Sequence, residues 1–336
     1  MYDVVGIGNA LVDTEFQLSE DQLTKTGLTR GNMTLADADA QATLFDTLNA
    51  QGITPAKQAG GGSAANSMVA FASLGGSAYY HCRVGGDEMG DFYLGDLEAS
   101  GVTTDADFAV HRDGTTGSCA VLVTPDGERT MQTHLGTSSE ICADNVDFET
   151  LGRAKWLYLE GYLAMSPSVS DTLTQLHTTA RKHGVKVAVS FADPAVVKFA
   201  KEGLLAMLDR GVDAVFCNFE EASLFAEADG EADPVNALLK YSELVVITNS
   251  DKPAIIACRG DTGIIEHHID AAPVSQVIDT NGAGDNYAGA FLYGLSQGLE
   301  LPVCGKLAAE VAAAIVSQFG PRLSVADYQA IKAKTL

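Results

Sequence analysis

The chain has few basic residues for its length. Of 336 residues, 21 are Lys or Arg and 44 are Asp or Glu, so the formal net charge at pH 7 is −23. A surface of this sign repels the phosphates of nucleic acids and the headgroups of anionic lipids, which disfavours both as partners. A small anionic substrate is still compatible with the composition, because backbone amides and one arginine can dominate the potential inside a pocket.

Cysteine frameworks and long apolar runs are absent as well. The six cysteines lie far apart in the sequence, and none forms a CxxC pair or a His/Cys cluster with metal-ligand spacing. We expect them to be small buried hydrophobes in a reducing compartment. No apolar run is long enough to cross a bilayer, and the first residues show no signal peptide. The sequence therefore predicts a cytoplasmic protein, and it leaves open whether that protein is a monomer or a homodimer.

What remains is a globular composition, with 46% hydrophobic and 19% charged residues, which excludes disorder, collagen and coiled coil. Short apolar runs alternate with amphipathic patterns such as residues 171–183, which predicts a layered α/β fold. The runs are typical of strands buried on both faces of a parallel sheet. They cover residues 4–8, 156–159, 185–190, 214–217 and 244–248.

Two regions interrupt this alternation. Residues near 10–36 and near 106–136 are rich in Thr, Asp and Gly, and the second region contains a turn at residues 125–128. Both predict antiparallel strands that leave the main sheet, either as a small lid over one edge or as an ordinary β-extension. Because no repeat or flexible linker divides the chain, we expect a single domain over residues 1–336.

The strongest chemical signal is the segment Asp279-Thr280-Asn281-Gly282-Ala283-Gly284-Asp285. It follows the β-like residues Val277 and Ile278 and precedes a helical pattern over residues 286–298. Small residues before a helix let backbone N–H groups converge on one point, where the helix N-terminus adds partial positive charge. Asp285 would then face a bound anion and could accept a proton from an attacking hydroxyl. The alternative is a tight turn in which Asp285 only caps the helix.

Three further polar positions have both a functional and a structural explanation. The run Gly60-Gly61-Gly62-Ser63-Ala64-Ala65-Asn66 leads into a helix, where Asn66 either binds hydroxyls or only caps the helix. Asp13 either accepts hydrogen bonds from a diol or lies on the surface. Asn218 and Glu221 follow a predicted strand, where ligands of α/β sheets bind, or they form only an acidic first helical turn.

Other common chemistries find no support in the sequence. There is no Walker P-loop, no Ser-His-Asp elbow and no HExxH motif. The sequence Gly6-Ile7-Gly8 lacks the third glycine of a dinucleotide-binding fingerprint and is not followed by a helical pattern. A dinucleotide-dependent oxidoreductase is therefore the least favoured hypothesis.

Together these segments resemble the ribokinase-like (PfkB) family of carbohydrate and nucleoside kinases. The likeness rests on the Gly-rich entry ending in Asn66, on residues 84–90, on Asn218 with Glu221, and on the highly specific residues 279–285. These motifs stand in the family's order and cover essentially the whole chain. The resemblance implies a layered α/β/α domain with a mainly parallel sheet and a small β-strand lid. It also implies ATP, Mg²⁺ and, as in many relatives, a monovalent cation such as K⁺.

Within the family, the motifs are most similar to those of adenosine kinases, for example residues 8–13, 116–119 and 160–162. The resemblance implies that Asp285 is the general base, that Arg129 lies near the transferred phosphoryl group, and that Gly282, Ala283 and Gly284 form an anion hole. It assigns acceptor binding to Asp13, Asn9, Gly61, Gly62, Ser63, Asn66, Met131, Tyr162 and Leu163, with Met33 also placed against the base. It assigns nucleotide binding to Asn218, Thr248, Asp279, Thr280, Asn281, Gly282 and Gly284, and Mg²⁺, largely through water, to Asn218 and Glu221.

The function expected from this resemblance is ATP-dependent phosphorylation of a primary hydroxyl on a ribose-containing acceptor, with the 5′-hydroxyl of adenosine favoured. A kinase for ribose, fructose or a related sugar, or for inosine or guanosine, is the alternative within the family. A non-catalytic regulator that binds a nucleoside or sugar is the alternative from a different class.

Overall fold

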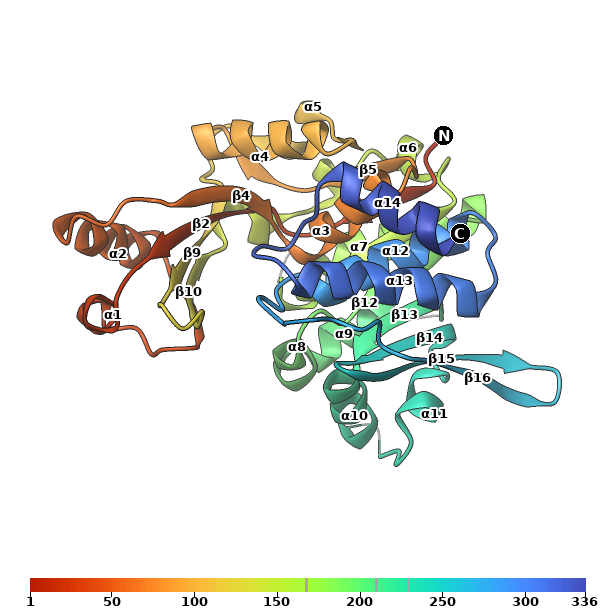
Figure 1. Cartoon of the computed structure of the whole chain (residues 1–336). Coiled ribbons are helices and arrows are strands. Elements are labelled where there is room, and N and C mark those ends of the chain that lie inside the picture. The colour runs from red at the N-terminus through yellow and green to blue at the C-terminus, as the bar shows by residue number, and fades with distance from the viewer. Residues whose placement is uncertain (167–168, 209–210, 229) are drawn as a thin grey trace.

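The computed structural model describes residues 1–166, 169–208, 211–228 and 230–336, and its strands form a large sheet and a smaller one (Figure 1). The large sheet has nine strands. In spatial order these are β16 (Gly263–Ile269), β15 (Lys252–Gly260), β14 (Ser242–Asn249), β13 (Val212–Asn218), β12 (Lys186–Ser190), β11 (Trp156–Glu160), β1 (Val4–Ile7), β5 (Ala78–His81) and β7 (Val102–Thr103). This arrangement confirms the predicted layered α/β architecture.

The centre of the large sheet consists of the strands that the apolar runs predict. β1 pairs in parallel with β11 and β5, and the parallel pairing continues from β11 through β14. All residues of β1 and β11 are buried, because helices cover both faces of the sheet. β15 and β16 then complete the sheet as an antiparallel hairpin.

The predicted strand at Val277 and Ile278 is wrong. Residues 270–280 are an irregular segment between β16 and the helix that follows, and the side chains of Val277 and Ile278 are exposed. The N–H groups of Ile278 and Asp279 donate to the carbonyl of Val316 instead of joining a ladder. Two adjacent apolar residues thus resembled a buried strand although neither belongs to the core.

The helices form one layer on each face of the large sheet (Figure 1). The layer shown mainly in blue contains α12, α13 and α14, together with α3. Their bounds are α3 (Ser63–Ser73), α12 (Ala283–Ser296), α13 (Leu301–Val316) and α14 (Val325–Thr335). The opposite layer contains α6 (Phe148–Leu151), α7 (Val169–His183), α8 (Pro194–Phe199), α9 (Lys201–Leu208), α10 (Phe219–Ala228) and α11 (Pro234–Leu238).

The predicted apolar stripe of residues 286–298 falls on α12, which begins three residues earlier than expected and ends at Ser296. Ala288, Phe291 and Leu292 are buried against the sheet and the neighbouring helices. α12 also packs unusually close to α3, since a Cβ on Gly289 would lie 2.2 Å from the carbonyl oxygen of Ser67. This close approach aligns the N-terminal turns of the two helices.

The smaller sheet projects from one side of the molecule, at the left of Figure 1. Its five strands, in spatial order, are β3 (Met33–Leu35), β10 (Arg129–His134), β9 (Gly117–Val123), β2 (Leu11–Gln17) and β4 (Lys57–Gly61). It therefore includes residues 57–61, which lie outside the two segments expected from the sequence. Residues 106–111 form α5 (Ala106–Ala109) and β8 (Val110–His111), and β8 pairs instead with β6 (Val84–Gly85).

The two faces of the smaller sheet differ in composition. One face packs Phe16, Ala120 and Leu122 against α1 (Glu20–Thr26) and α2 (Ala38–Ala50). Strand alternation places Asp13 and Glu15 on the other face. The register then aligns Glu15 with Val121, Met131 and Met33 across four strands. Helices α1 and α2 do not cover this face. It carries Asp13, Met131 and Met33, which the sequence assigns to hydroxyl or base binding.

All six cysteines are free thiols, and Cys82, Cys119, Cys217 and Cys304 are buried, which agrees with their expected role as small hydrophobes. Among the residues that the structure describes, no helix is both long enough and apolar enough to cross a membrane. One more helix, α4 (Glu88–Ala99), lies beside β4 and contributes to the site described below.

Replacing Phe291 by Ala tests whether α12 is anchored by its core stripe. Phe291 is fully buried, and its ring contacts those of Phe216 and Tyr287. We expect Phe291→Ala to lower the free energy of unfolding by about 3–5 kcal/mol in denaturant titrations. Phe199→Ala is the matched control, because Phe199 is 80% exposed. It should change stability by less than about 0.5 kcal/mol, and equal losses in both variants would contradict the assignment.

Candidate active site

The predicted site residues gather at the carboxyl ends of the parallel strands, where ligands of α/β sheets bind. Asn9 follows β1, Glu160 ends β11, and Asn218 ends β13 beside Thr248 of β14. The N-terminal turns of α3 and α12 reach the same edge, as does the face of the smaller sheet that carries Asp13.

Asp285 lies in the first turn of α12 and accepts hydrogen bonds from the first turn of α3. Its Oδ1 is 2.6 Å from Ser63 Oγ, and its Oδ2 is 3.0 Å from Asn66 Nδ2. Burial raises the pKa of Asp285, whereas these two hydrogen bonds and the charge of Arg322 lower it. The two Gly-rich segments that the sequence singled out thus meet at one carboxylate, which the donors favour in its ionised form.

Residues 280–284, at the start of α12, form a turn with the features of an anion-binding site, which we call the anion turn. Gly282 caps the helix with φ of +76°, and a Cβ there would lie 2.5 Å from Cβ of Pro321, so glycine is required on both grounds. A Cβ on Gly284 would meet no atom within 4 Å, so the space beside it is open. The first N–H groups of a helix have no intrahelical acceptor and carry the positive end of its dipole. The N–H of Ala283 also donates to the carbonyl of Thr280 at 3.3 Å, and an anion such as phosphate is the ligand expected at this end of the helix.

Asp279 connects this turn to the smaller sheet. Its Oδ2 accepts hydrogen bonds from Arg129 Nη1 at 2.6 Å and from the N–H of Gly320 at 2.9 Å, while its Oδ1 accepts from the N–H of Asn281 at 3.0 Å. Arg129 stands on β10 and also pairs with Glu15 at 3.5 Å. The guanidinium that the resemblance places near the phosphoryl group therefore does lie at the anion turn.

Asp13 faces the site from β2. A Cβ on Gly61 would lie 2.7 Å from both carboxylate oxygens of Asp13, so only glycine lets β4 approach this closely. Gly62 has φ of +96°, and a Cβ there would lie 2.5 Å from the carbonyl oxygen of Asn9. Burial raises the pKa of Asp13 to about 6, against the charges of Arg322 and Arg129. A half-buried carboxylate between two cations is not an ordinary surface residue.

Glu160 is a residue of this site to which the sequence analysis assigned no role. It is almost completely buried, and its carboxylate accepts from the N–H of Asn9 at 3.3 Å, from Asn9 Nδ2 at 3.1 Å and from the N–H of Ala64 at 2.8 Å. Burial raises its pKa to about 7. Glu160 thereby ties the end of β1 to the start of α3 and holds the amide of Asn9. Its signal in the sequence was one acidic residue directly after an apolar strand.

Asn218 and Glu221 bind each other at the start of α10. The N–H and Nδ2 of Asn218 donate to the two carboxylate oxygens of Glu221, and the N–H of Glu221 donates to Asn218 Oδ1. Burial, together with the carboxylates of Asp193 and Asp285, raises the pKa of Glu221 to about 7, against the hydrogen bond from the N–H of Asn218. Such uncompensated negative charge fits a divalent cation.

Within the described residues, no three acidic, cysteine or histidine side chains converge closely enough to hold a metal by themselves. Mg²⁺ commonly keeps several waters and binds through one or two carboxylates together with substrate phosphates. Glu221 with Asn218 would hold it in that manner, opposite the anion turn.

The apolar residues assigned to base binding are only partly brought together. Met131 and Met33 pair directly across β10 and β3, and Met33 is 47% exposed. Tyr162 is half-buried, and its hydroxyl donates to Asp193 at 3.3 Å. Leu163 is fully buried in the apolar layer beneath, so it offers no free surface to a ligand.

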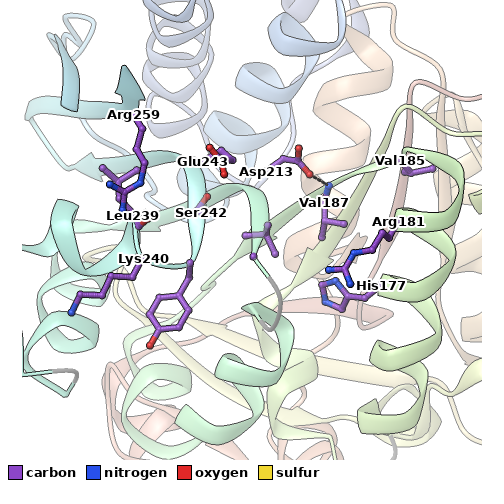
Figure 2. A pocket seen from close by; sticks show the side chains of 13 residues that line it. His177, Arg181, Val185, Val187, Asp213, Leu239, Lys240, Ser242, Glu243 and Arg259 are labelled. Atoms are coloured by element: carbon purple, nitrogen blue, oxygen red, sulfur yellow. Dashed lines mark hydrogen bonds between the residues drawn. The ribbon is translucent and has the colours of Figure 1, made fainter. Parts of the chain in front are cut away.

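A cavity of about 420 Å³ lies at the opposite edge of the sheet, at the amino ends of β12, β13 and β14 (Figure 2). Several of its polar groups bind the protein itself. Asp213 accepts from the N–H of Val187 at 2.8 Å, and Arg259 Nη2 donates to the carbonyl of Leu239 at 2.7 Å. The cavity shares no residue with the site around Asp285, which makes it an unsuitable place for the reaction.

The fold, with the carboxylate of Asp285 beside the N-terminal turn of α12, is that expected of a kinase. Residues 25–327 match the model of the pfkB family carbohydrate kinases, so the chain belongs to the PfkB family. Kinases of this family use ATP with Mg²⁺.

The relatives include both nucleoside and sugar kinases. The chain is 32% identical to the adenosine kinase of Sinorhizobium meliloti, with a TM-score of 0.86 over 100% of this chain and 99% of that one. It is 31% identical to a probable sugar kinase protein from Rhizobium etli CFN 42, also with a TM-score of 0.86 and the same coverage. It is 27% identical to the adenosine kinase of Saccharomyces cerevisiae, over 95% of this chain and 96% of that protein.

If Glu221 holds Mg²⁺, its raised pKa would make that binding sensitive to pH. Because protons and Mg²⁺ compete for this carboxylate, affinity should fall as pH decreases through about 7. We expect Mg²⁺ to raise the melting temperature more at about pH 8 than at about pH 5. Glu221→Gln should remove the response at the higher pH.

Glu243→Gln is the control, because Glu243 is an exposed acid at the far end of β14. It should retain the wild-type response to Mg²⁺. A melting temperature that responds equally to Mg²⁺ in wild type and Glu221→Gln would contradict the metal assignment.

Proposed function

We propose that this kinase transfers the γ-phosphoryl group of ATP to the 5′-hydroxyl of a ribonucleoside, with adenosine as the acceptor. The observation that carries the proposal is the position of the Asp285 carboxylate. It lies in the first turn of α12, beside the anion turn, and accepts hydrogen bonds from Ser63 and Asn66 of α3. Adenosine is supported by relatives named adenosine kinase at 27% and 32% identity. The relative named as a probable sugar kinase makes a free sugar the competing acceptor.

In the proposed mechanism, the oxygen of the acceptor's primary hydroxyl attacks the γ-phosphorus of ATP, and ADP departs. Asp285 accepts the proton that this hydroxyl loses. The N–H groups of Gly282, Ala283 and Gly284, at the positive end of α12, stabilise the charge on the phosphoryl oxygens. Arg129 would leave its ion pair with Asp279 and donate to these phosphoryl oxygens instead. Mg²⁺, when bound near Asn218 and Glu221, neutralises charge on the phosphates.

The remaining nucleotide contacts in the proposal lie along the same edge. Thr248 stands beside Asn218 at the end of β14, and exposed Thr280 and half-buried Asn281 stand in the anion turn. These positions follow the path of an extended phosphate chain from α12 toward β13 and β14.

The acceptor would lie between the large sheet and the smaller one. Asp13 and Asn66, with the backbone of Gly61 and Gly62, would bind the ribose hydroxyls, and Asn9 would support them through Glu160. Met131, Met33 and Tyr162 would contact the flat faces of a purine, with Leu163 acting only as a support beneath Tyr162. In this proposal residues 1–336 form one kinase domain whose smaller sheet is the lid that excludes water.

Asp285→Asn is the direct test of the chemistry. The amide keeps the size of the carboxylate but cannot accept a proton, so kcat should fall by about 10²–10⁴-fold. ADP release is measured with MgATP and a panel of adenosine, inosine, guanosine, ribose and fructose. Near-wild-type turnover of this variant on the preferred acceptor would contradict the role of Asp285.

The lid face tests the choice of acceptor. Met131→Ala removes apolar contact worth about 1.5 kcal/mol, so KM for adenosine should rise about tenfold. KM for free ribose should not change, because ribose has no base to contact. Ile265→Ala, an exposed apolar residue on β16, is the control and should leave both values unchanged. An unaltered KM for adenosine in Met131→Ala, or a preference for a free sugar, would overturn the purine assignment.

A further inference from the structure

Three consecutive residues after α13, Gly320, Pro321 and Arg322, bind residues of the site. The N–H of Gly320 donates to Asp279 Oδ2 at 2.9 Å, and the carbonyl of Pro321 accepts from Asn286 Nδ2 at 2.7 Å. Arg322 follows, with a side chain that is only 12% exposed. Because its two predecessors are fixed to the anion turn and to α12, the backbone of Arg322 has a defined position relative to Asp285.

The guanidinium of Arg322 connects two helices. Its Nε donates to Asn66 Oδ1 on α3 at 2.9 Å, and its Nη1 pairs with Asp96 Oδ2 on α4 at 2.5 Å. The remaining nitrogen, Nη2, is buried and has no hydrogen-bond partner among the described residues. Buried donors are rarely left unsatisfied in proteins. The contacts of Nε and Nη1 therefore determine the position of this side chain, although this leaves Nη2 without a partner in the described part of the chain.

The contact with Asn66 determines which way its amide faces. A guanidinium only donates, so the amide atom that meets Arg322 must be the oxygen. The amide nitrogen of Asn66 is then directed to Asp285, which it reaches at 3.0 Å. Arg322 and Asp285 therefore favour the same orientation of the amide, and without Arg322 only the carboxylate would hold it.

Asp285 lies near other acids, since its carboxylate raises the pKa of Glu160 on β11 and of Glu221 on α10. Arg322 is the cation that lowers the pKa of Asp285 against this surrounding charge and against burial. The same guanidinium lowers the pKa of Asp13.

We propose that Arg322 is a positioning residue for phosphoryl transfer, which fixes the amide of Asn66 and so holds the carboxylate of Asp285 in its orientation. The inference rests on the proposed role of Asp285 as the base. Arg322 acts through Asn66 and does not itself contact the reacting atoms.

Arg322→Gln should lower kcat by about 10–100-fold, the scale of a small misplacement of a reacting group. KM for the acceptor should rise as well, because Asn66 is also proposed to bind the ribose hydroxyls. The pH below which kcat declines should move upward, because loss of the cation raises the pKa of Asp285. Arg322→Lys keeps the charge but loses the fork, so it should restore the wild-type pH dependence and only part of kcat.

A double-mutant cycle with Asn66→Ala separates this role from a general loss of stability. If Arg322 acts through Asn66, Arg322→Gln should lower kcat of the Asn66→Ala variant by no more than about twofold. Lys334→Gln, which removes an exposed charge from the same C-terminal segment, is the control and should leave kcat and its pH dependence unchanged. Melting temperatures of all variants identify those that are not folded, and for these the Lys variant provides the test.

A full, multiplicative effect of Arg322→Gln in the Asn66→Ala background would overturn the inference, and so would an unchanged pH dependence in Arg322→Gln. If Asp285→Asn retains turnover, the proposed base itself fails and the inference fails with it. If Asp285→Asn loses turnover while Arg322→Gln behaves as wild type, the function stands and only the role of Arg322 is lost.

Discussion

The contact between α3 and α12 is the constraint on which the site depends. Gly289 lets the two helices approach until its Cα lies against the backbone of Ser67, and Ser67 Oγ in turn donates to the carbonyl of Asp285 at 2.9 Å. This packing brings together two turns that are more than two hundred residues apart in the chain. The carboxylate, its donors and the open N-terminus of α12 are therefore placed by core packing rather than by flexible loops. A preorganised site of this kind loses little free energy to rearrangement when charge develops.

Electrostatic balance is the second theme of the structure. Five carboxylates, those of Asp13, Glu160, Asp193, Glu221 and Asp285, lie around the ends of the central strands. Arg129 and Arg322 lower the pKa of Asp13, and Arg322 lowers that of Asp285. Burial raises the pKa of Glu160 and of Glu221 to about 7, which is the usual consequence of removing acids from water. The overall charge of −23 thus has a local counterpart at the site, where bound Mg²⁺ would compensate part of it.

The sequence predicted the features that are encoded by adjacent residues. The central strands were predicted correctly because each is a short run buried on both faces, and Asp285 and Asn66 were recognised because they stand in contiguous Gly-rich motifs. Arg322 was missed because it belongs to no local pattern, and Glu160, although part of a recognised motif, was given no role because its partners Asn9 and Ala64 lie far away in the chain. β4 was likewise not assigned to the smaller sheet, since its glycines gave no strand signal. Val277 and Ile278 were misassigned because apolar character alone does not distinguish a buried strand from an exposed extended segment.

The ion pair between Arg129 and Asp279 connects the smaller sheet to the turn before α12, so a solute that competes for either charge would weaken this connection. Separating the sheets would leave Arg129 with Glu15 and Asp279 with two backbone N–H groups, so each charge keeps a partner in either arrangement. A phosphate that takes the guanidinium competes with Asp279 for it, and dissolved salt weakens the same attraction. By thermodynamic reciprocity, any ligand that favours one separation of the sheets must itself bind more tightly when that separation is enforced.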